Sequence, residues 1–192
     1  MPQATCFAQD EINSETMKIR MATDLDHDGI QKVNMRAFPE SENKLISKLA
    51  ISLLSEKTTP QTISLVAEAD GMIVGHTAFS PVRVDADKHF LGYILAPLAI
   101  DPNFQKRLIG STLVKTGIEM LSTLKVNILF VYGDPEYYTR FGFSTKEACR
   151  YTPPYKLQYP FGWQAVMLGE NDTATSPLSL TCVDSLCHPE LW

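Results

Sequence analysis

Pro97–Leu113 reads Pro-Leu-Ala-Ile-Asp-Pro-Asn-Phe-Gln-Lys-Arg-Leu-Ile-Gly-Ser-Thr-Leu and joins the end of an apolar run to the start of an amphipathic one. The apolar run breaks at Asp101-Pro102, and a short polar loop over residues 103–107 follows. Beyond the loop, apolar residues recur at helical spacing. They are Leu113, Val114, Ile118, Leu121 and Leu124. The stretch therefore predicts a strand, a tight loop and the N-terminus of a helix.

This junction is a candidate anion site. The first N–H groups of a helix have no partner within the helix, and the helix dipole places partial positive charge beside them. Lys106 and Arg107 add two full positive charges at the same place. We therefore expect a phosphate-bearing ligand here. The alternative is an ordinary strand-to-helix junction, a unit that many α/β proteins contain.

Length and composition indicate a globular protein with one main domain. A chain of 192 residues with 44% hydrophobic and 20% charged residues suits a single core. We expect residues 1–16 to form a loose extension and residues 17–192 one domain. The net charge of −5 argues against a nucleic-acid partner. No apolar run is long enough to cross a membrane, and residues 1–15 lack the pattern of a secretory signal, so we expect a cytoplasmic protein with no membrane partner.

The cysteines do not predict a metal site. The chain has four, Cys6, Cys149, Cys182 and Cys187, and no Cys-x-x-Cys pair. Cys182 and Cys187-His188 could contribute to a zinc site, but a fourth ligand at recognisable spacing is missing. We expect idle or buried thiols and no metal.

The chain before the junction predicts helices followed by an antiparallel sheet. Thr23 or Asp24 can cap a helix that ends at Pro39, and Ser41 begins a second helical stretch. Asp70-Gly71 is a hairpin signal between two strand-like runs. The expected strands are 17–20, 62–69, 72–80 with its continuation 82–84, and 89–100. Because a strand–loop–helix unit follows these antiparallel strands in the chain, we expect a mixed sheet.

The chain after the junction predicts a buried parallel strand and a short helix. Asn127–Tyr132 is a nearly continuous apolar run, typical of a strand buried on both faces. A strand, a helix and a strand in this order should place the two strands parallel. Asp134 and Pro135 fit the N-cap and first position of a helix over residues 136–141, and Gly142 fits its end. We further expect an ordered aromatic loop from Tyr151, a strand over 164–168, a polar connection over 172–177 and a last strand over 178–183.

Two motifs carry a resemblance to a known family. Tyr138–Phe143 reads Tyr-Thr-Arg-Phe-Gly-Phe and matches Tyr-x-x-x-Gly-Phe, while Gln105–Gly110 matches Gln/Arg-x-x-Gly-x-Gly/Ala with Leu108 in place of the first glycine. Together they resemble the GNAT N-acetyltransferase superfamily, and the form Gly-Asp-Pro-x-Tyr-Tyr-x-Arg-Phe-Gly-Phe resembles one bacterial branch of it. The resemblance spans residues 17–168. It implies an α/β fold with a mixed, mostly antiparallel sheet, one splayed parallel strand pair and flanking helices.

Leu108 is the departure from the family pattern. A glycine at this place lets the backbone approach a pyrophosphate without a Cβ in the way. Two interpretations stay open. Leu108 fits if its side chain points into the core, whereas a side chain that blocks the backbone would weaken cofactor binding.

The resemblance implies acetyl-CoA as co-substrate. Its pantetheine arm would lie between the splayed strands on backbone of the first, and its pyrophosphate on the N–H groups of residues 106–111. Pro97 marks an irregular edge where the splaying can begin. The loop Phe38–Glu42 would border the acceptor site. The candidate cofactor-binding residues are Leu98, Ala99, Ile100, Gln105, Lys106, Arg107, Leu108, Ile109, Gly110 and Ser111.

The family pattern also implies a catalytic tyrosine. Tyr138 stands where the family places the hydroxyl that acts as general acid for the leaving thiolate, with Tyr137 as the alternative. A backbone N–H near Leu98 would polarise the thioester carbonyl. The general base stays unassigned among a chain of waters and several side chains of the sheet region. Those side chains are Glu68, His76, Asp85, His89 and Tyr93.

The expected function is transfer of an acetyl or other acyl group from acetyl-CoA to a primary amine of a small molecule or peptide, by direct attack in a ternary complex. One alternative is a module of the same fold that binds acyl-CoA without turnover. A second is an unrelated nucleotide-binding α/β domain. The sequence identifies neither the acceptor nor the oligomeric state.

Overall fold

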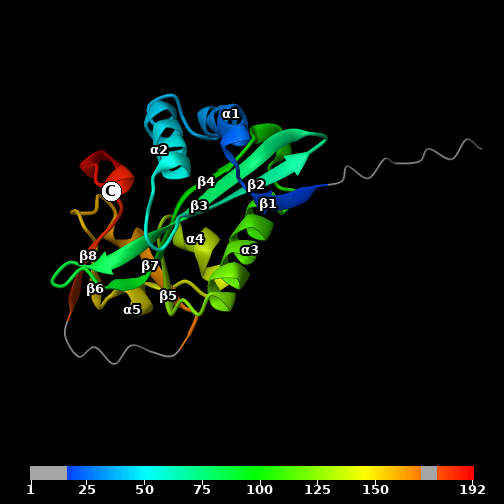
Figure 1. Cartoon of the computed structure of the whole chain (residues 1–192). Helices are drawn as coiled ribbons and strands as arrows, with labels where there is room; N and C mark the ends of the chain where they lie inside the picture. Colours follow the sequence, from blue (N-terminus) through cyan, green and yellow to red (C-terminus); the bar gives the residue numbers. More distant parts are fainter. Residues whose placement is uncertain (1–16, 170–176) are drawn as a thin grey trace, which may run out of the picture.

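The structure is a computed structural model that describes residues 17–169 and 177–192. The expected N-terminal extension over 1–16 and nearly all of the polar connection over 172–177 lie outside the described residues. A single mixed sheet has the strand order β1-β2-β3-β4-β5-β7, and β8 pairs with β3 and with β6. Helices cover both faces of this sheet (Figure 1).

The strands of the sheet are β1 (Lys18–Met21), β2 (Ile63–Ala69), β3 (Met72–Val84), β4 (Phe90–Ile100), β5 (Ile128–Tyr132), β6 (Tyr151–Thr152), β7 (Trp163–Met167) and β8 (Leu178–Thr181). The helices are α1 (His27–Ala37), α2 (Asn43–Ser55), α3 (Ile109–Thr123), α4 (Pro135–Tyr138) and α5 (Thr145–Ala148). The β4–β5 pair is parallel, and so is the short β6–β8 pair. The mixed, mostly antiparallel sheet that the sequence predicts is confirmed.

Two short elements lie where the sequence pattern predicts none. Helix α5 has four residues, too few for an apolar periodicity, and begins where the Ser144 hydroxyl accepts a bond from the Glu147 N–H at 3.2 Å. Strand β6 opens the Pro- and aromatic-rich stretch that we expected to be a loop, and pairs with β8 far along the chain. Such pairing is decided by tertiary contact, which local pattern does not reveal.

Strand β5 is buried on both faces, as its continuous apolar run predicts. Leu129 and Val131 pack in the core beneath α3, whereas Ile128 and Phe130 pack in the core beneath α2. Because side chains alternate across a strand, one five-residue strand serves both cores. On the α3 side the contact is close at Gly117, where a Cβ would lie 2.0 Å from the Phe79 ring.

The parallel pair separates part-way along β4. Tyr93, Ile94 and Leu95 pair with β5, but β4 continues to Ile100 beyond the last pair, Leu95 with Val131. At the same place the register against β3 shifts, since Leu95 lies opposite Phe79 and Leu98 opposite Thr77. The irregularity expected at Pro97 is therefore confirmed, and it leaves the second half of β4 with one open edge.

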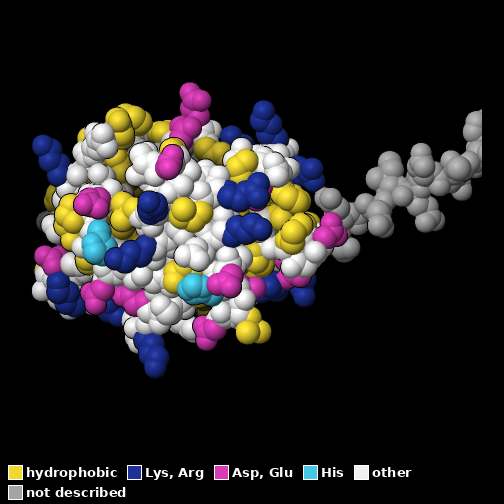
Figure 2. Space-filling view, turned by 90° about the horizontal axis from the view of Figure 1, so that it is seen from above, with side chains coloured by type: hydrophobic (Ala, Val, Ile, Leu, Met, Phe, Trp, Pro, Cys, Tyr) yellow, Lys and Arg dark blue, Asp and Glu magenta, His cyan; other side chains and the backbone are white. Residues whose placement is uncertain are grey.

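The surface above α1 and α2 carries acidic and basic side chains interspersed with apolar ones (Figure 2). Among the described residues, no helix combines the length and hydrophobicity needed to cross a membrane.

Candidate active site

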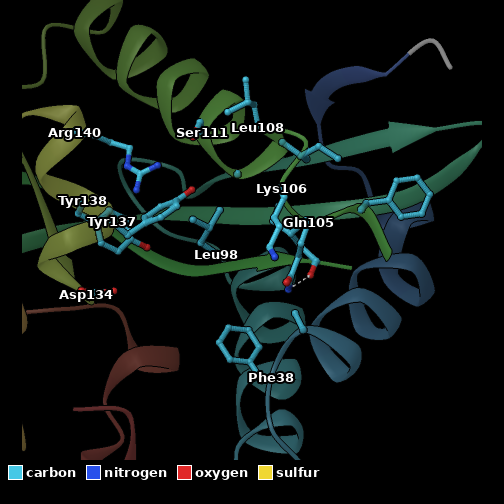
Figure 3. Close-up of a pocket in the computed structure, with 15 residues that line it drawn as sticks. Phe38, Leu98, Gln105, Lys106, Leu108, Ser111, Asp134, Tyr137, Tyr138 and Arg140 are labelled. Carbon is cyan, nitrogen blue, oxygen red and sulfur yellow. Dashed lines mark hydrogen bonds between the residues drawn. The ribbon is translucent and has the colours of Figure 1, made fainter. Parts of the chain in front are cut away.

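A cavity of about 550 Å³ opens where β4 and β5 separate. Figure 3 shows its two sides: Gln105, Lys106 and Leu108 stand opposite Asp134, Tyr137, Tyr138 and Arg140, with Leu98 between them. The remaining lining residues are Ala37, Phe38, Ile100, Phe104, Ile109, Gly110 and Ser111. The two sequence motifs thus face each other across one space.

The open edge of β4 supplies backbone hydrogen-bonding groups. Asp101 N–H donates to Val74 O at 2.9 Å, and backbone groups alternate in direction along an antiparallel strand. The backbone groups of Ala99 therefore point to β3, whereas those of Leu98 and Ile100 point to the open edge. Gln105 Nε2 donates to Ile100 O at 3.4 Å on that edge. Leu98 and Ile100 line the cavity; Ala99 is buried and does not.

On the opposite wall, the N-terminus of α3 presents backbone amides that no described residue pairs. Thr112 N–H makes the first bond of the helical ladder, to Leu108 O at 2.9 Å, so the N–H groups of residues 109–111 precede the ladder. Lys106 and Leu108 both have left-handed backbone, with φ of 62°. Alternation of this conformation with ordinary helical backbone makes concave nests of N–H groups that favour anions.

Leu108 does not point into the core. Its side chain is 73% exposed, so the interpretation that buries it is wrong. The residue is the N-cap of α3 in the left-handed region, which a side chain disfavours and a glycine adopts freely. Leu108 therefore adopts the left-handed backbone conformation that a glycine would adopt freely at this position of the motif. Its side chain lies at the mouth of the cavity.

The two basic residues of the loop differ in position. Lys106 lines the cavity. Arg107 does not, because its guanidinium lies over the Phe104 ring, 5.1 Å from the ring centroid. Arg140 supplies positive charge on the α4 side, where its guanidinium lies 4.8 Å from the centroid of the Tyr137 ring.

Gly110 and Tyr137 meet across the cavity. A Cβ on Gly110 would lie 2.6 Å from the Tyr137 hydroxyl, so a side chain at residue 110 would displace the ring. That hydroxyl forms a hydrogen bond with the Ser111 side chain. Burial raises the pKa of Tyr137, while the hydrogen bond from Ser111 opposes the rise. Tyr137 therefore connects α4 to the N-terminus of α3.

Tyr138 has a buried ring and an unengaged hydroxyl. The ring packs edge-on against Phe143 and lies close to Gly133. Among the described residues no side chain or backbone group hydrogen-bonds its hydroxyl, and the residue lines the cavity. Burial raises the pKa of Tyr138, so the hydroxyl stays protonated and can donate a hydrogen bond.

None of the five side chains considered as general base lines the cavity. Glu68 is paired with Arg20 at 2.8 Å, and the Tyr93 hydroxyl donates to Gln61 O at 3.0 Å. Asp85 and His89 lie in the turn between β3 and β4.

His76 is fully buried away from the cavity. Desolvation lowers its pKa to about 3, so the ring is neutral. Ser64 and Asn34 hold its two ring nitrogens at 3.0 and 3.2 Å, and both are buried as well. This Ser–His–Asn chain resembles a hydrolase triad only in composition, because no substrate can reach it.

Five lining residues, among them Ala37 at the end of α1, are missing from the set inferred from sequence. Asp134 and Arg140 belong to the second motif, and the spacing of Arg140 three residues after Tyr137 could have placed it on the same side of the helix. Phe38 lies in the loop expected at the acceptor site. Phe104 carries no sequence signal. Within the described part of the chain, no group of three or more His, Cys, Asp or Glu side chains could hold a metal ion.

Comparison with known families matches residues 28–143 to the family model described as "Acetyltransferase (GNAT) family". Two curated relatives come from Escherichia coli. An uncharacterized N-acetyltransferase, YjhQ, is 35% identical over 136 residues, which cover 70% of this chain and 72% of the relative. Another, YhbS, is 34% identical over 130 residues, which cover 66% of this chain and 73% of the relative.

Two solved structures share the fold. The crystal structure of Escherichia coli YhbS in complex with CoA aligns with a TM-score of 0.73 and 26% identity, covering 86% of this chain and 90% of the other. A GNAT family acetyltransferase from Brucella melitensis in complex with acetyl-CoA aligns with a TM-score of 0.61 and 27% identity, covering 85% of this chain and 95% of the other.

Proposed function

The chain belongs to the GNAT family of acetyltransferases, and on that premise we propose that it transfers an acetyl group from acetyl-CoA to a primary amine by direct attack in a ternary complex. The observation that carries the proposal is the 550 Å³ cavity between the separated strands, with unpaired α3 amides on one wall and the Tyr138 hydroxyl on the other.

The cavity walls suit each part of an acyl-CoA. The amides of residues 109–111 and the Lys106 ammonium suit the pyrophosphate. The outward backbone groups of Leu98 and Ile100 suit the amides of the pantetheine arm, which would pair with this edge as an added strand does. Gly110 leaves the space between α3 and Tyr137 that a Cβ would fill.

Residues near the end of β4 and on α4 suit the chemical step. Acetyl-CoA supplies the acyl group, whose C–S bond breaks as the amine nitrogen forms the C–N bond. The outward N–H of Leu98 stabilises charge on the carbonyl oxygen, and Tyr138 donates a proton to the sulfur that leaves with the electron pair. The proton that the amine loses passes to solvent and restores the tyrosine hydroxyl, so the products are the acetylated amine and the free thiol.

Thiol release tests the proposal against a module that binds acyl-CoA without turnover. We expect the full chain to bind CoA in calorimetry and to release thiol from acetyl-CoA only when an acceptor amine is present. Binding without release, across a broad panel of amines, favours the non-catalytic module. Absence of CoA binding contradicts both.

A further inference from the structure

A second cavity of about 480 Å³ meets the first at Asp134, the only described residue that lines both. Its volume lies in the range of pockets that hold small molecules. Four segments far apart in the sequence form it: the start of α2, the end of β5, the loop over 158–162 and the segment over 190–192.

The charge of this cavity is opposite to that of the cofactor cavity. Its charged lining residues are Glu42, Asp134 and Glu190, and no lysine, arginine or histidine is among the described residues that line it. The cofactor cavity shares Asp134 but adds Lys106 and Arg140, so its positively charged side chains outnumber its carboxylates. One cavity therefore suits an anion and its neighbour suits a cation, so their two ligands are distinguished by charge.

The remaining surface of the second cavity is largely apolar and aromatic. Tyr159 and Phe161 are 53% and 63% exposed at its edge, with ring centroids 5.8 Å apart. Exposed apolar side chains that cluster at the edge of a cavity often mark a binding site, and the faces of aromatic rings attract cations. The other apolar lining residues are Leu45, Ile46, Tyr132, Leu191 and Trp192.

Hydrogen bonds and ring contacts hold these walls in place. Tyr159 N–H donates to the Tyr132 hydroxyl at 2.9 Å, which ties the 158–162 loop to the end of β5. Trp192 stacks on Tyr132, with ring centroids 6.4 Å apart, and its Nε1–H donates to Leu186 O at 3.0 Å. These contacts hold three of the four segments together around the cavity.

We propose that this second cavity binds the acceptor, and that the acceptor is a small primary amine with an apolar, aromatic body and no carboxylate beside the amine. The inference rests on the proposed acetyl transfer. The protonated amine enters toward the carboxylates and its apolar body contacts the aromatic edge. Asp134 then holds the nitrogen at the junction of the two cavities, and the ammonium gives one proton to solvent so that the neutral amine can attack the thioester.

Three amines separate charge from apolar contact. Phenethylamine has both features, phenylalanine adds one carboxylate, and ethanolamine keeps the charge without the aromatic body. We expect kcat/KM for phenethylamine to exceed that for each of the others by about tenfold or more. One exposed charge pair is worth up to about fivefold, and the carboxylate of phenylalanine would meet more than one carboxylate of the cavity. Ethanolamine would lose the contact with the aromatic edge. A higher kcat/KM for phenylalanine or ethanolamine overturns the assignment and leaves the transferase intact.

Paired substitutions locate the effect in the cavity. The double variant Glu42→Gln with Glu190→Gln should raise KM for phenethylamine about fivefold, narrow the preference over phenylalanine and leave KM for acetyl-CoA unchanged. Phe161→Ala should raise KM for phenethylamine but not for ethanolamine. Glu119→Gln, an exposed change on α3 outside both cavities, is the matched control. Equal effects in the control and the double variant contradict the proposal.

A binding measurement needs no turnover. Calorimetry should detect phenethylamine binding to the CoA-loaded chain, weakened about fivefold in the Glu42→Gln, Glu190→Gln double variant. Unchanged binding in that variant overturns the acceptor site. If the chain binds no CoA at all, the proposed function fails and the acceptor assignment fails with it.

Discussion

The two cavities that meet at Asp134 are built in different ways. The cofactor cavity takes most of its lining from two short stretches, 98–111 and 134–140, and presents backbone amides with two basic side chains. The second cavity is lined almost entirely by side chains of four distant segments and carries three carboxylates. On our proposal, backbone groups would recognise what every acyl-CoA shares, whereas side chains would distinguish one amine from another.

The difference shows how a common cofactor and a variable acceptor can share one fold. The edge of a strand and the N-terminus of a helix offer backbone hydrogen-bonding groups whatever side chains they carry. The cofactor cavity therefore depends on few specific side chains. The proposed acceptor side would depend on Glu42, Tyr159, Phe161 and Glu190, which all lie outside the strands and α-helices, where sequence change is better tolerated.

The largest effect should come from Tyr138, because the proposed proton transfer to sulfur is the same whichever amine is the acceptor. Tyr138→Phe deletes only the hydroxyl, so kcat should fall about 100-fold with every acceptor while the Kd for CoA stays unchanged. Steady-state thiol release and calorimetry measure the two quantities. Tyr137→Phe is the control and should affect kcat less, since that hydroxyl is engaged by Ser111. Full turnover in Tyr138→Phe would assign the acid to Tyr137 or to water.

Gly110→Val should alter the cofactor cavity alone. The new side chain meets the Tyr137 hydroxyl, at 2.6 Å from the Cβ position, and overpacking of about 2 kcal/mol weakens CoA binding about 30-fold. KM for the amine should not change. Adding Tyr137→Phe removes the contacted oxygen and should restore part of the CoA affinity. If CoA affinity is unchanged in a folded Gly110→Val protein, the α3 N-terminus is not the pyrophosphate site.

Lys106 and Arg107 test which of two adjacent charges faces the cofactor. Lys106→Gln should weaken CoA binding about fivefold, the equivalent of about 1 kcal/mol, because its ammonium lines the cavity. Arg107→Gln should weaken it less, because that guanidinium lies over Phe104. Calorimetry at two salt concentrations measures both effects. The reverse order would mean that Arg107 turns toward the phosphates when CoA binds.

The smallest effect is expected at Leu108. Leu108→Gly removes the cost of about 1 kcal/mol that a residue with a Cβ pays in the left-handed conformation, and it removes only an exposed side chain. The melting temperature should therefore stay constant or rise by a few degrees. Leu108→Ala keeps a Cβ in the same conformation and should show no gain. A fall of about 2 kcal/mol or more, the cost of losing a buried leucine, would contradict the exposed position.

The sequence predicted most of the fold because its signals are local. The apolar run 127–132 predicts a strand buried on both faces. Asp134 and Pro135 mark the start of the short helical segment after it, and Gly142 marks its end. Helix α5 and strand β6 escaped prediction. One is too short to show a period, and the other depends on a distant partner.

The candidate site divides in the same way. The sequence by itself determined the family, the loop from Gln105 to Ser111 and the tyrosine pair, because each is a contiguous motif. Only the tertiary structure decided that Leu108 is exposed, that Ala99 turns its backbone away and that Glu42 and Glu190 share a cavity. Orientation and assembly depend on strand pairing and on contacts between distant segments, and no spacing within one segment encodes them.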